Sequence, residues 1–201
     1  SLPNSPIEVN ISSSEIQKII DLCKKYKCLI VFDEAYYGFG SKSQIQKYKK
    51  HNNIIITRSF SKSFGLTAIR LGILISNKKI LNKVEIKRLA YETNIFSSII
   101  CEYFIKNFKI VKAYNREIIK SREWLKNTLI KKKIECRAIN SMQLMIRLNK
   151  QKIRSIVTKL NKRKIYIKGP LPKPFDDVIV VTIGNKNTML NFYKNLLKVI
   201  S

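Results

Sequence analysis

The sequence predicts an α/β fold with a mainly parallel sheet, followed by a smaller α+β unit. Three apolar runs of strand length occur in the first half of the chain: CLIVF (28–32), NIIIT (53–57) and LGILIS (71–76). Helical or loop sequence separates the first two runs, which is the order expected of a layered α/β fold. Continuous apolar runs, rather than alternating ones, are typical of strands covered on both faces. After about residue 133, short strands alternate with single helices.

The first helix is marked by its start signal. Ser12 followed by Glu15 predicts a capping box, in which each side chain hydrogen-bonds the backbone of the other residue. Apolar side chains then recur at helical spacing, at Ile16, Ile19, Ile20 and Cys23. We expect this helix to run to about Lys27 and to lead directly into the first strand.

The chain from about residue 77 to residue 133 is expected to be mostly helical. Beyond it, strands are expected at 134–139, 143–148, 165–167 and 178–183, with helices near 150–163 and at the C-terminus. The last helix carries an apolar stripe that we assign to the core: Met189, Leu190, Phe192, Tyr193, Leu196, Leu197 and Ile200. The sequence therefore predicts the later part of a large domain at 1–108, and a linking helix with a small C-terminal domain at 109–201.

Composition excludes some classes of protein. Apolar residues make up 45% of the 201 residues, but no run of about 18 apolar residues could cross a membrane. The first residues, SLPNSPIEVN, lack the basic and apolar parts of a signal peptide. Because Ser1 is not a start methionine, we expect the chain to be incomplete at its N-terminus. We expect a cytoplasmic protein.

Cysteine and histidine usage does not predict a metal site. The four cysteines, at positions 23, 28, 101 and 136, lack metal-binding spacing, and the sole histidine is His51. We expect free buried thiols in a reducing compartment. We also expect His51 to be exposed and without a function.

The net charge of +27 is compatible with nucleic-acid binding, because Lys and Arg neutralise phosphate groups. The basic residues are, however, spread along every amphipathic segment. The densest spots, 131–133 and 161–164, lack the interleaved aromatic residues that stack on bases. A nucleic-acid-binding module is therefore an alternative that rests on charge alone, and we do not expect it.

Polar residues follow the first two strands at the point where each ends. Asp33 and Tyr36 follow the first strand, and Ser59, Ser61 and Lys62 follow the second. Ligands of parallel sheets bind beyond the carboxyl ends of the strands. We therefore expect these side chains to share one crevice, with Arg70 nearby.

These residue types meet the needs of a phosphorylated pyridine aldehyde. An amine forms a Schiff base with the aldehyde, a carboxylate keeps the ring nitrogen protonated, and a phenol binds the ring hydroxyl. Hydroxyl groups and a guanidinium hold the phosphate. The carboxylate is needed because a protonated ring is the better electron sink for a carbanion.

Two motifs resemble those of one enzyme family. FDEAYYGF (32–39), followed by SFSKSFGLTAIRLG (59–72), is similar to the fold-type-I pyridoxal-phosphate enzymes of aminotransferase class I/II, and most to the histidinol-phosphate aminotransferase branch. The resemblance implies that Lys62 is the Schiff-base lysine. It also implies that Asp33 pairs with the pyridinium and that Tyr36 binds the ring oxygen.

The resemblance further implies that Ser59, Ser61 and Arg70 bind the phosphate of pyridoxal 5′-phosphate. The implied enzyme is cytosolic and homodimeric, with each active site completed by the other subunit. It acts on a small-molecule amino substrate and an oxo acceptor. The chain is expected to hold the C-terminal two-thirds or less of the family fold.

Three positions depart from the family pattern. Ser5, in SPIE (5–8), replaces the asparagine that helps to hold the ring hydroxyl, and Ser5 stays a cofactor-binding candidate. Val180 replaces the arginine that clamps the substrate α-carboxylate, and valine cannot form that bidentate pair. Gln143 lies near the place where another asparagine is expected, and Arg147 is a candidate to replace the missing clamp.

The residues and the resemblance together predict an aminotransferase that moves an amino group between an amino acid or amino-phosphate compound and an oxo acceptor. Two alternatives stay open. One is a pyridoxal-phosphate-dependent decarboxylase on the same scaffold. The other is a truncated or inactive aminotransferase remnant that acts, if at all, through dimerisation.

Overall fold

A computed structural model describes residues 1–9, 11–138 and 140–200. The chain forms two compact units. The first unit comprises Ser1–Asn4 and Val9–Tyr114, and the second comprises Ser5–Glu8 and Asn115–Ser201. The division into domains at 1–108 and 109–201 stays a prediction, since spatial compactness alone does not define a domain of a family fold.

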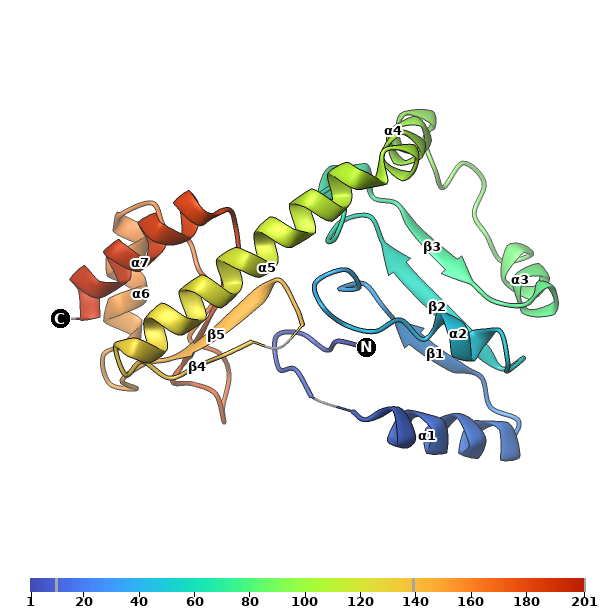
Figure 1. Ribbon diagram of the computed structural model, residues 1–201, viewed down its shortest axis with the longest axis horizontal. Coiled ribbons are helices and arrows are strands. Elements are labelled where there is room, and N and C mark those ends of the chain that lie inside the picture. Colours follow the sequence, from blue (N-terminus) through green and yellow to red (C-terminus); the bar gives the residue numbers. More distant parts are fainter. Residues whose placement is uncertain (10, 139, 201) are drawn as a thin grey trace. The chain divides into compact units, whose positions relative to one another are not determined.

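The first unit contains a small sheet with helices before, between and after its strands (Figure 1). Its elements are α1 (Ser13–Lys25), β1 (Ile30–Asp33), α2 (Ile45–Tyr48), β2 (Ile54–Ser59), a 3-10 helix (Thr67–Ile69), β3 (Gly72–Ile75), α3 (Lys78–Glu85) and α4 (Ile95–Lys106). Each of the three predicted strands is confirmed, with ends shifted by one or two residues.

The sheet of the first unit is mixed. Strand β2 lies between β1 and β3, pairing in parallel with β1 and antiparallel with β3. A mainly parallel sheet is therefore not what these strands form. The reason lies in residues 60–71, which hold only one 3-10 helix: the Phe60 N–H bonds the Leu71 carbonyl at 3.2 Å, so the chain reverses instead of crossing over.

The core of the first unit lies between α1 and one face of the sheet. The capping box is confirmed: the Ser12 side chain accepts from the Glu15 N–H, and the Glu15 side chain accepts from the Ser12 N–H. The buried residues are Ile16, Ile20, Phe32, Ile54 and Ile56. The prediction that the strands are covered on both faces is confirmed for β2, where Ile54, Ile55 and Ile56 are all buried. It is wrong for β1 and β3, because Val31 is 55% exposed and Ile73 is 42% exposed.

The second unit combines an antiparallel sheet with helices. Its elements are the second part of α5 (Phe108–Lys131), β4 (Cys136–Arg137), β5 (Gln143–Arg147), α6 (Ile153–Lys162), β6 (Val178–Thr182) and α7 (Lys186–Ile200). Strand β5 pairs with β4 on one side and β6 on the other, antiparallel to both. The expected strand at 165–167 is wrong, since only Lys168 forms an isolated bridge there, to Val180. Ile139, the end of the strand expected at 134–139, lies outside the described residues.

Helix α7 confirms the assignment of its apolar stripe to the core, since Met189, Phe192 and Leu196 are buried. No helix in the described part of the chain is both long enough and apolar enough to span a bilayer.

The four cysteines are free, but their burial differs. Cys101 is buried, and desolvation raises the pKa of its thiol, so the thiol stays protonated and unreactive. Cys28 is exposed, so the expectation of buried thiols is wrong there.

Candidate active site

The parallel pair β1–β2 brings two polar strand ends together. Asp33 is in register with Thr57, and its carboxylate oxygen Oδ1 accepts two hydrogen bonds, one from the Ala35 N–H at 3.0 Å and one from the Thr57 hydroxyl at 3.2 Å. The second oxygen, Oδ2, has no hydrogen-bond partner within the described residues. The carboxylate is thus fixed in position while one of its oxygens is available to a ligand.

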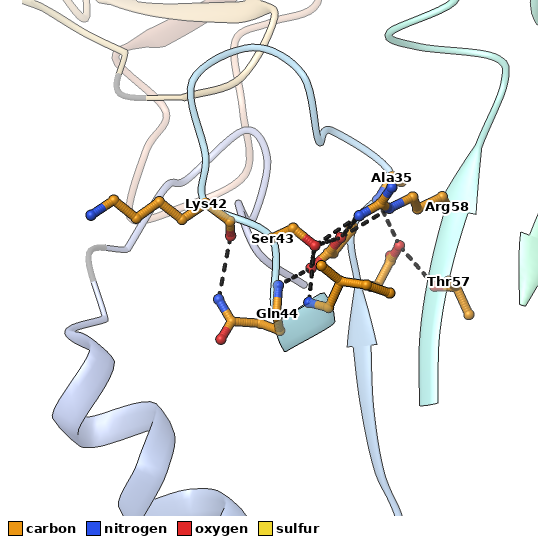
Figure 2. Close-up of polar contacts among 9 residues, drawn as sticks. Ala35, Lys42, Ser43, Gln44, Thr57 and Arg58 are labelled. Carbon is orange, nitrogen blue, oxygen red and sulfur yellow. Dashed lines mark hydrogen bonds and ion pairs between the residues drawn. The ribbon is translucent and has the colours of Figure 1, made fainter. Parts of the chain in front are cut away.

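Glu34 and Arg58, the residues that follow the register pair of Asp33 and Thr57, form an ion pair that the sequence reasoning missed. The side chain of Glu34 is 1% exposed, and its Oε2 lies 3.0 Å from both Nε and Nη2 of Arg58. The same carboxylate accepts from the Ser43 hydroxyl at 2.9 Å and from the Gln44 N–H at 2.5 Å. Figure 2 shows Ser43, Gln44 and Arg58 converging on this carboxylate.

This network ties three segments to each other. Arg58 also donates to the Ser43 hydroxyl at 2.7 Å, and its guanidinium lies 4.1 Å from the centre of the Tyr37 ring. The segment after β1, the loop that carries Ser43 and the end of β2 are therefore held in one arrangement. One sequence feature could have indicated this ion pair. Glu34 and Arg58 carry opposite charges, and each lies one residue beyond the register pair of Asp33 and Thr57.

Lys62 and Tyr36 lie together, as predicted for residues that follow neighbouring strands. The Lys62 ammonium lies 5.6 Å from the centre of the Tyr36 ring, and both residues are half-buried. Within the described residues, this ammonium has neither an ion-pair partner nor a hydrogen-bond acceptor. The turn that presents it closes with a hydrogen bond from the Gly65 N–H to the Lys62 carbonyl at 3.0 Å.

The three residues expected to bind phosphate differ in their surroundings. The Ser59 hydroxyl accepts from the Ser61 N–H at 3.0 Å, so its own O–H is left to donate. Arg70 is exposed, has a left-handed backbone with φ of 53°, and donates from Nη1 to the Thr67 carbonyl at 3.2 Å. The two serines are thus brought together, whereas the Arg70 guanidinium bonds the backbone of its own turn.

Ser5 belongs to the second unit. Its hydroxyl donates to the side-chain oxygen of Gln143 at 2.5 Å, so two of the positions that depart from the family pattern contact each other. Nearby, the buried Glu8 carboxylate accepts from the backbone N–H groups of Asn140 and Ser141, at 2.5 and 2.8 Å. These bonds hold the N-terminal segment 5–8 to the start of β5.

The two positions considered for the carboxylate clamp are occupied by other interactions. Val180 is 2% exposed and packs with Leu171 and Val178 in a small core of the second unit. Arg147 forms ion pairs with Glu135 at 3.0 Å and with Asp177 at 2.9 Å. Arg147 is therefore already paired with two carboxylates.

A lysine ammonium thus lies beside an aromatic ring, just beyond the ends of two neighbouring strands. The profile of the family described as "Aminotransferase class I and II" matches residues 2–175, and the chain belongs to this family. Within it, the chain is like the histidinol-phosphate aminotransferases. The histidinol-phosphate aminotransferase of Thermotoga neapolitana is 26% identical over 194 residues, which cover 96% of this chain and 55% of that protein. The chain therefore spans about half the length of such relatives.

Solved structures agree on the fold. The crystal structure of the histidinol-phosphate aminotransferase from Clostridium acetobutylicum superposes with a TM-score of 0.87 at 23% identity, covering 98% of this chain and 61% of that one. A decarboxylase from Sulfurospirillum multivorans superposes with a TM-score of 0.86 at 17% identity, covering 99% of this chain and 60% of that one. The fold is thus the fold-type-I aminotransferase fold, which proteins of both descriptions share.

Proposed function

We propose that the protein is a pyridoxal-phosphate-dependent aminotransferase of the histidinol-phosphate type, with Lys62 as its catalytic residue. The observation that carries the proposal is a lysine ammonium that lies 5.6 Å from the centre of the Tyr36 ring and has no ion-pair partner within the described residues. The family to which the chain belongs uses pyridoxal 5′-phosphate. The substrates, the dimer and the activity of the whole protein are part of the proposal, because the chain spans about half of its relatives.

The donor set of the first unit fits this cofactor. Asp33 keeps one carboxylate oxygen without a partner in the described chain, which suits a ring N–H donor. The Lys62 amine is not neutralised by a carboxylate there. The phenol of Tyr36 belongs to the ring that lies beside this amine. An amine, a carboxylate and a phenol are the groups that a phosphorylated pyridine aldehyde requires.

Each residue then has a defined task. When bound, the cofactor supplies the electron sink that stabilises a carbanion at the substrate Cα. Asp33 would hold the ring nitrogen protonated, and Tyr36 would hold the ring oxygen. Lys62 would bind the aldehyde through Nζ. Once released by the amino substrate, Nζ would take the proton from the substrate Cα and hold it for transfer to the former aldehyde carbon.

The phosphate would be held by the Ser59–Ser61 turn together with Arg70. The Ser59 oxygen accepts from the Ser61 N–H. Its O–H has no acceptor within the described residues and can therefore donate to a phosphate. Arg70 uses Nη1 on a carbonyl, which leaves its other guanidinium donors for an anion. Ser5, in the second unit, stays a candidate on the sequence resemblance alone, and its hydroxyl donates to Gln143 there.

A visible absorption band tests this proposal. Purified protein with added pyridoxal 5′-phosphate is expected to show a visible band that borohydride removes. Lys62→Ala is expected to abolish the band, because it removes the amine that binds the aldehyde. The control, Lys18→Ala on the exposed face of α1, is expected to keep the band. A band that survives in Lys62→Ala, or that is missing from the unaltered protein, would show the proposal to be wrong.

A decarboxylase is the second candidate, and Val180 is the observation that favours it. A buried valine cannot orient a carboxylate by a charge-assisted pair, so an intact α-carboxylate lacks its usual partner at this position. Incubation with amino-acid phosphates separates the two reactions. Release of carbon dioxide without an oxo acceptor indicates decarboxylation, and amine transfer that requires an oxo acceptor indicates an aminotransferase.

A further inference from the structure

A second candidate site lies in the first unit, at the edge of the sheet opposite to Asp33 and Ser59. A cavity of about 1080 Å³ is lined there by Cys28 and Leu29, which precede β1, and by Asn53, which precedes β2. The six residues of β2 separate it from the proposed active site by roughly 20 Å. It is therefore distinct from the cofactor site.

Lysine dominates the lining of this cavity, which we call the basic cleft. Seven of its sixteen lining residues are lysines and none is acidic. Across the chain, by contrast, only 40 of 201 residues are Lys or Arg. The cleft is therefore about twice as basic as an average stretch of this already basic protein. Lys24 and Lys27 come from the end of α1, and Lys50 comes from the segment after α2.

Helix α3 supplies Lys78, Lys79 and Lys83 to the basic cleft, and Lys87 lies two residues beyond the end of the helix. Lys78 and Lys79 are the first two residues of the helix, where backbone N–H groups add partial positive charge. None of the seven ammonium groups has an ion pair or hydrogen bond within the described residues. Like charges are thus held around one hollow without a counterion from the chain.

His51 also lines the basic cleft, and here the sequence-based expectation is wrong. His51 is half-buried rather than exposed, and its Nδ1 is a buried atom without a hydrogen-bond partner among the described residues. A buried polar nitrogen without a partner is unfavourable. An anion in the cleft would be a partner both for the Nδ1–H of His51 and for the lysine ammonium groups.

The lining also indicates the size and kind of anion. The rest of the lining is aliphatic, from Leu29, Ile55, Ile80 and Val84, or uncharged and polar, from three asparagines, and no Phe, Tyr or Trp lines the cleft. Nucleic-acid grooves use aromatic rings as stacking platforms, so a nucleic acid is not favoured. The volume is that of a small-molecule site. We infer that the basic cleft binds a small anion that carries two or more phosphate groups, such as a free oligophosphate or a nucleoside triphosphate.

Calorimetric titration of the intact protein with inorganic tripolyphosphate tests this inference. We expect one binding site per chain and weaker binding at higher salt, since the attraction is screened. The triple variant Lys79→Gln, Lys83→Gln, Lys87→Gln is expected to bind at least about tenfold more weakly, because three of the seven nearby charges are lost.

The matched control removes the same charge elsewhere. Lys131, Lys132 and Lys133 are exposed, consecutive and outside the cleft, so their change to Gln is expected to weaken binding less than about threefold. Equal weakening by both triple variants would mean that only the net charge attracts the anion, and would overturn the inference. Circular dichroism confirms that both variants stay folded.

Two further arms exclude other sites and other partners. Arg70→Ala leaves the basic cleft intact, so a loss of tripolyphosphate binding in this variant would place the anion at the proposed active site and overturn the inference. ATP in place of tripolyphosphate separates nucleotides from free oligophosphates, and both results agree with the proposal. A single-stranded oligonucleotide that binds more tightly than either, through the same lysines, would show that the cleft is a nucleic-acid surface instead.

Discussion

A buried carboxylate such as that of Glu34 needs a partner for every lone pair that loses contact with water. Glu34 has these partners in Arg58, Ser43 and Gln44. Such a pair adds little net stability over an apolar pair, but loss of one partner leaves the other charge buried and is costly. We therefore regard Glu34 as a positioning residue that fixes the neighbouring Asp33 and the end of β2.

Glu34→Gln is expected to destabilise the protein by about 2 kcal/mol, because the partly buried Arg58 guanidinium loses its counter-charge. Urea denaturation measures this change in the free energy of unfolding. Glu102→Gln is the matched control, since Glu102 forms its ion pair with Lys106 on the exposed surface of α4, and no measurable change is expected there. Equal effects of the two substitutions would contradict the role assigned to the network.

At the residue scale, a motif in the sequence indicates candidates, whereas residues whose chemistry depends on burial were missed. The motif names Lys62, Asp33 and Tyr36 as candidates, and the structure confirms only that Lys62 and Tyr36 lie together. Glu34 and His51 could not, because a charged or polar side chain in a sequence looks the same whether water or protein surrounds it. Burial became visible only with the register of β1 and β2, which places Glu34 beside Arg58.

At the element scale, local signals were the most reliable. The capping box at Ser12 and Glu15 and the stripe of α7 were both confirmed, because each depends on residues within a few positions of each other. The direction of β3 was not predictable from its apolar composition. It is set by the hydrogen bond between Phe60 and Leu71, which pairs two ends of a loop.

The cap of α1 gives a pH-dependent prediction. Hydrogen bonds from Ser12 lower the pKa of Glu15 below its ordinary value of 4.5. A lowered folded-state pKa means that the stabilising contribution is complete above the unfolded pKa and fades as the pH falls through the folded one. Ser12→Ala is therefore expected to destabilise the protein, and to do so more at pH 7 than at pH 3.

Thermal denaturation of the unaltered protein and of Ser12→Ala at both pH values measures this difference. Ser13→Ala is the control, because Ser13 is exposed in the first turn of the helix and its side chain has no hydrogen bond within the described residues. A difference between Ser12→Ala and the unaltered protein that grows on acidification would contradict the assignment.

At the scale of the whole molecule, net charge governs association. The proposed homodimer would bring together two chains of +27 each, so repulsion opposes it and salt relieves the repulsion. Sedimentation velocity is expected to show a larger dimer fraction at about 300 mM salt, where the Debye length is roughly 6 Å, than at about 20 mM salt, where it is roughly 20 Å. A monomer under both conditions would contradict the dimer.

The assignment of segments to units was beyond the sequence. Residues 5–8 precede α1 in the chain but belong to the second unit, where Glu8 accepts hydrogen bonds from Asn140 and Ser141. These partners are separated by more than a hundred positions in the sequence, so no local pattern could indicate the pairing.

Helix α5 bears on attempts to build chimeras. The two units divide between Tyr114 and Asn115, inside the helix that runs from Phe108 to Lys131. A chimera fused at that point would join two halves of one helix from different proteins. The backbone hydrogen bonds from residue i to residue i−4 across the junction would then form only if the two halves continue the same helical turn. Exchange of modules with a relative is therefore better made at the ends of α5 than at the border between the units.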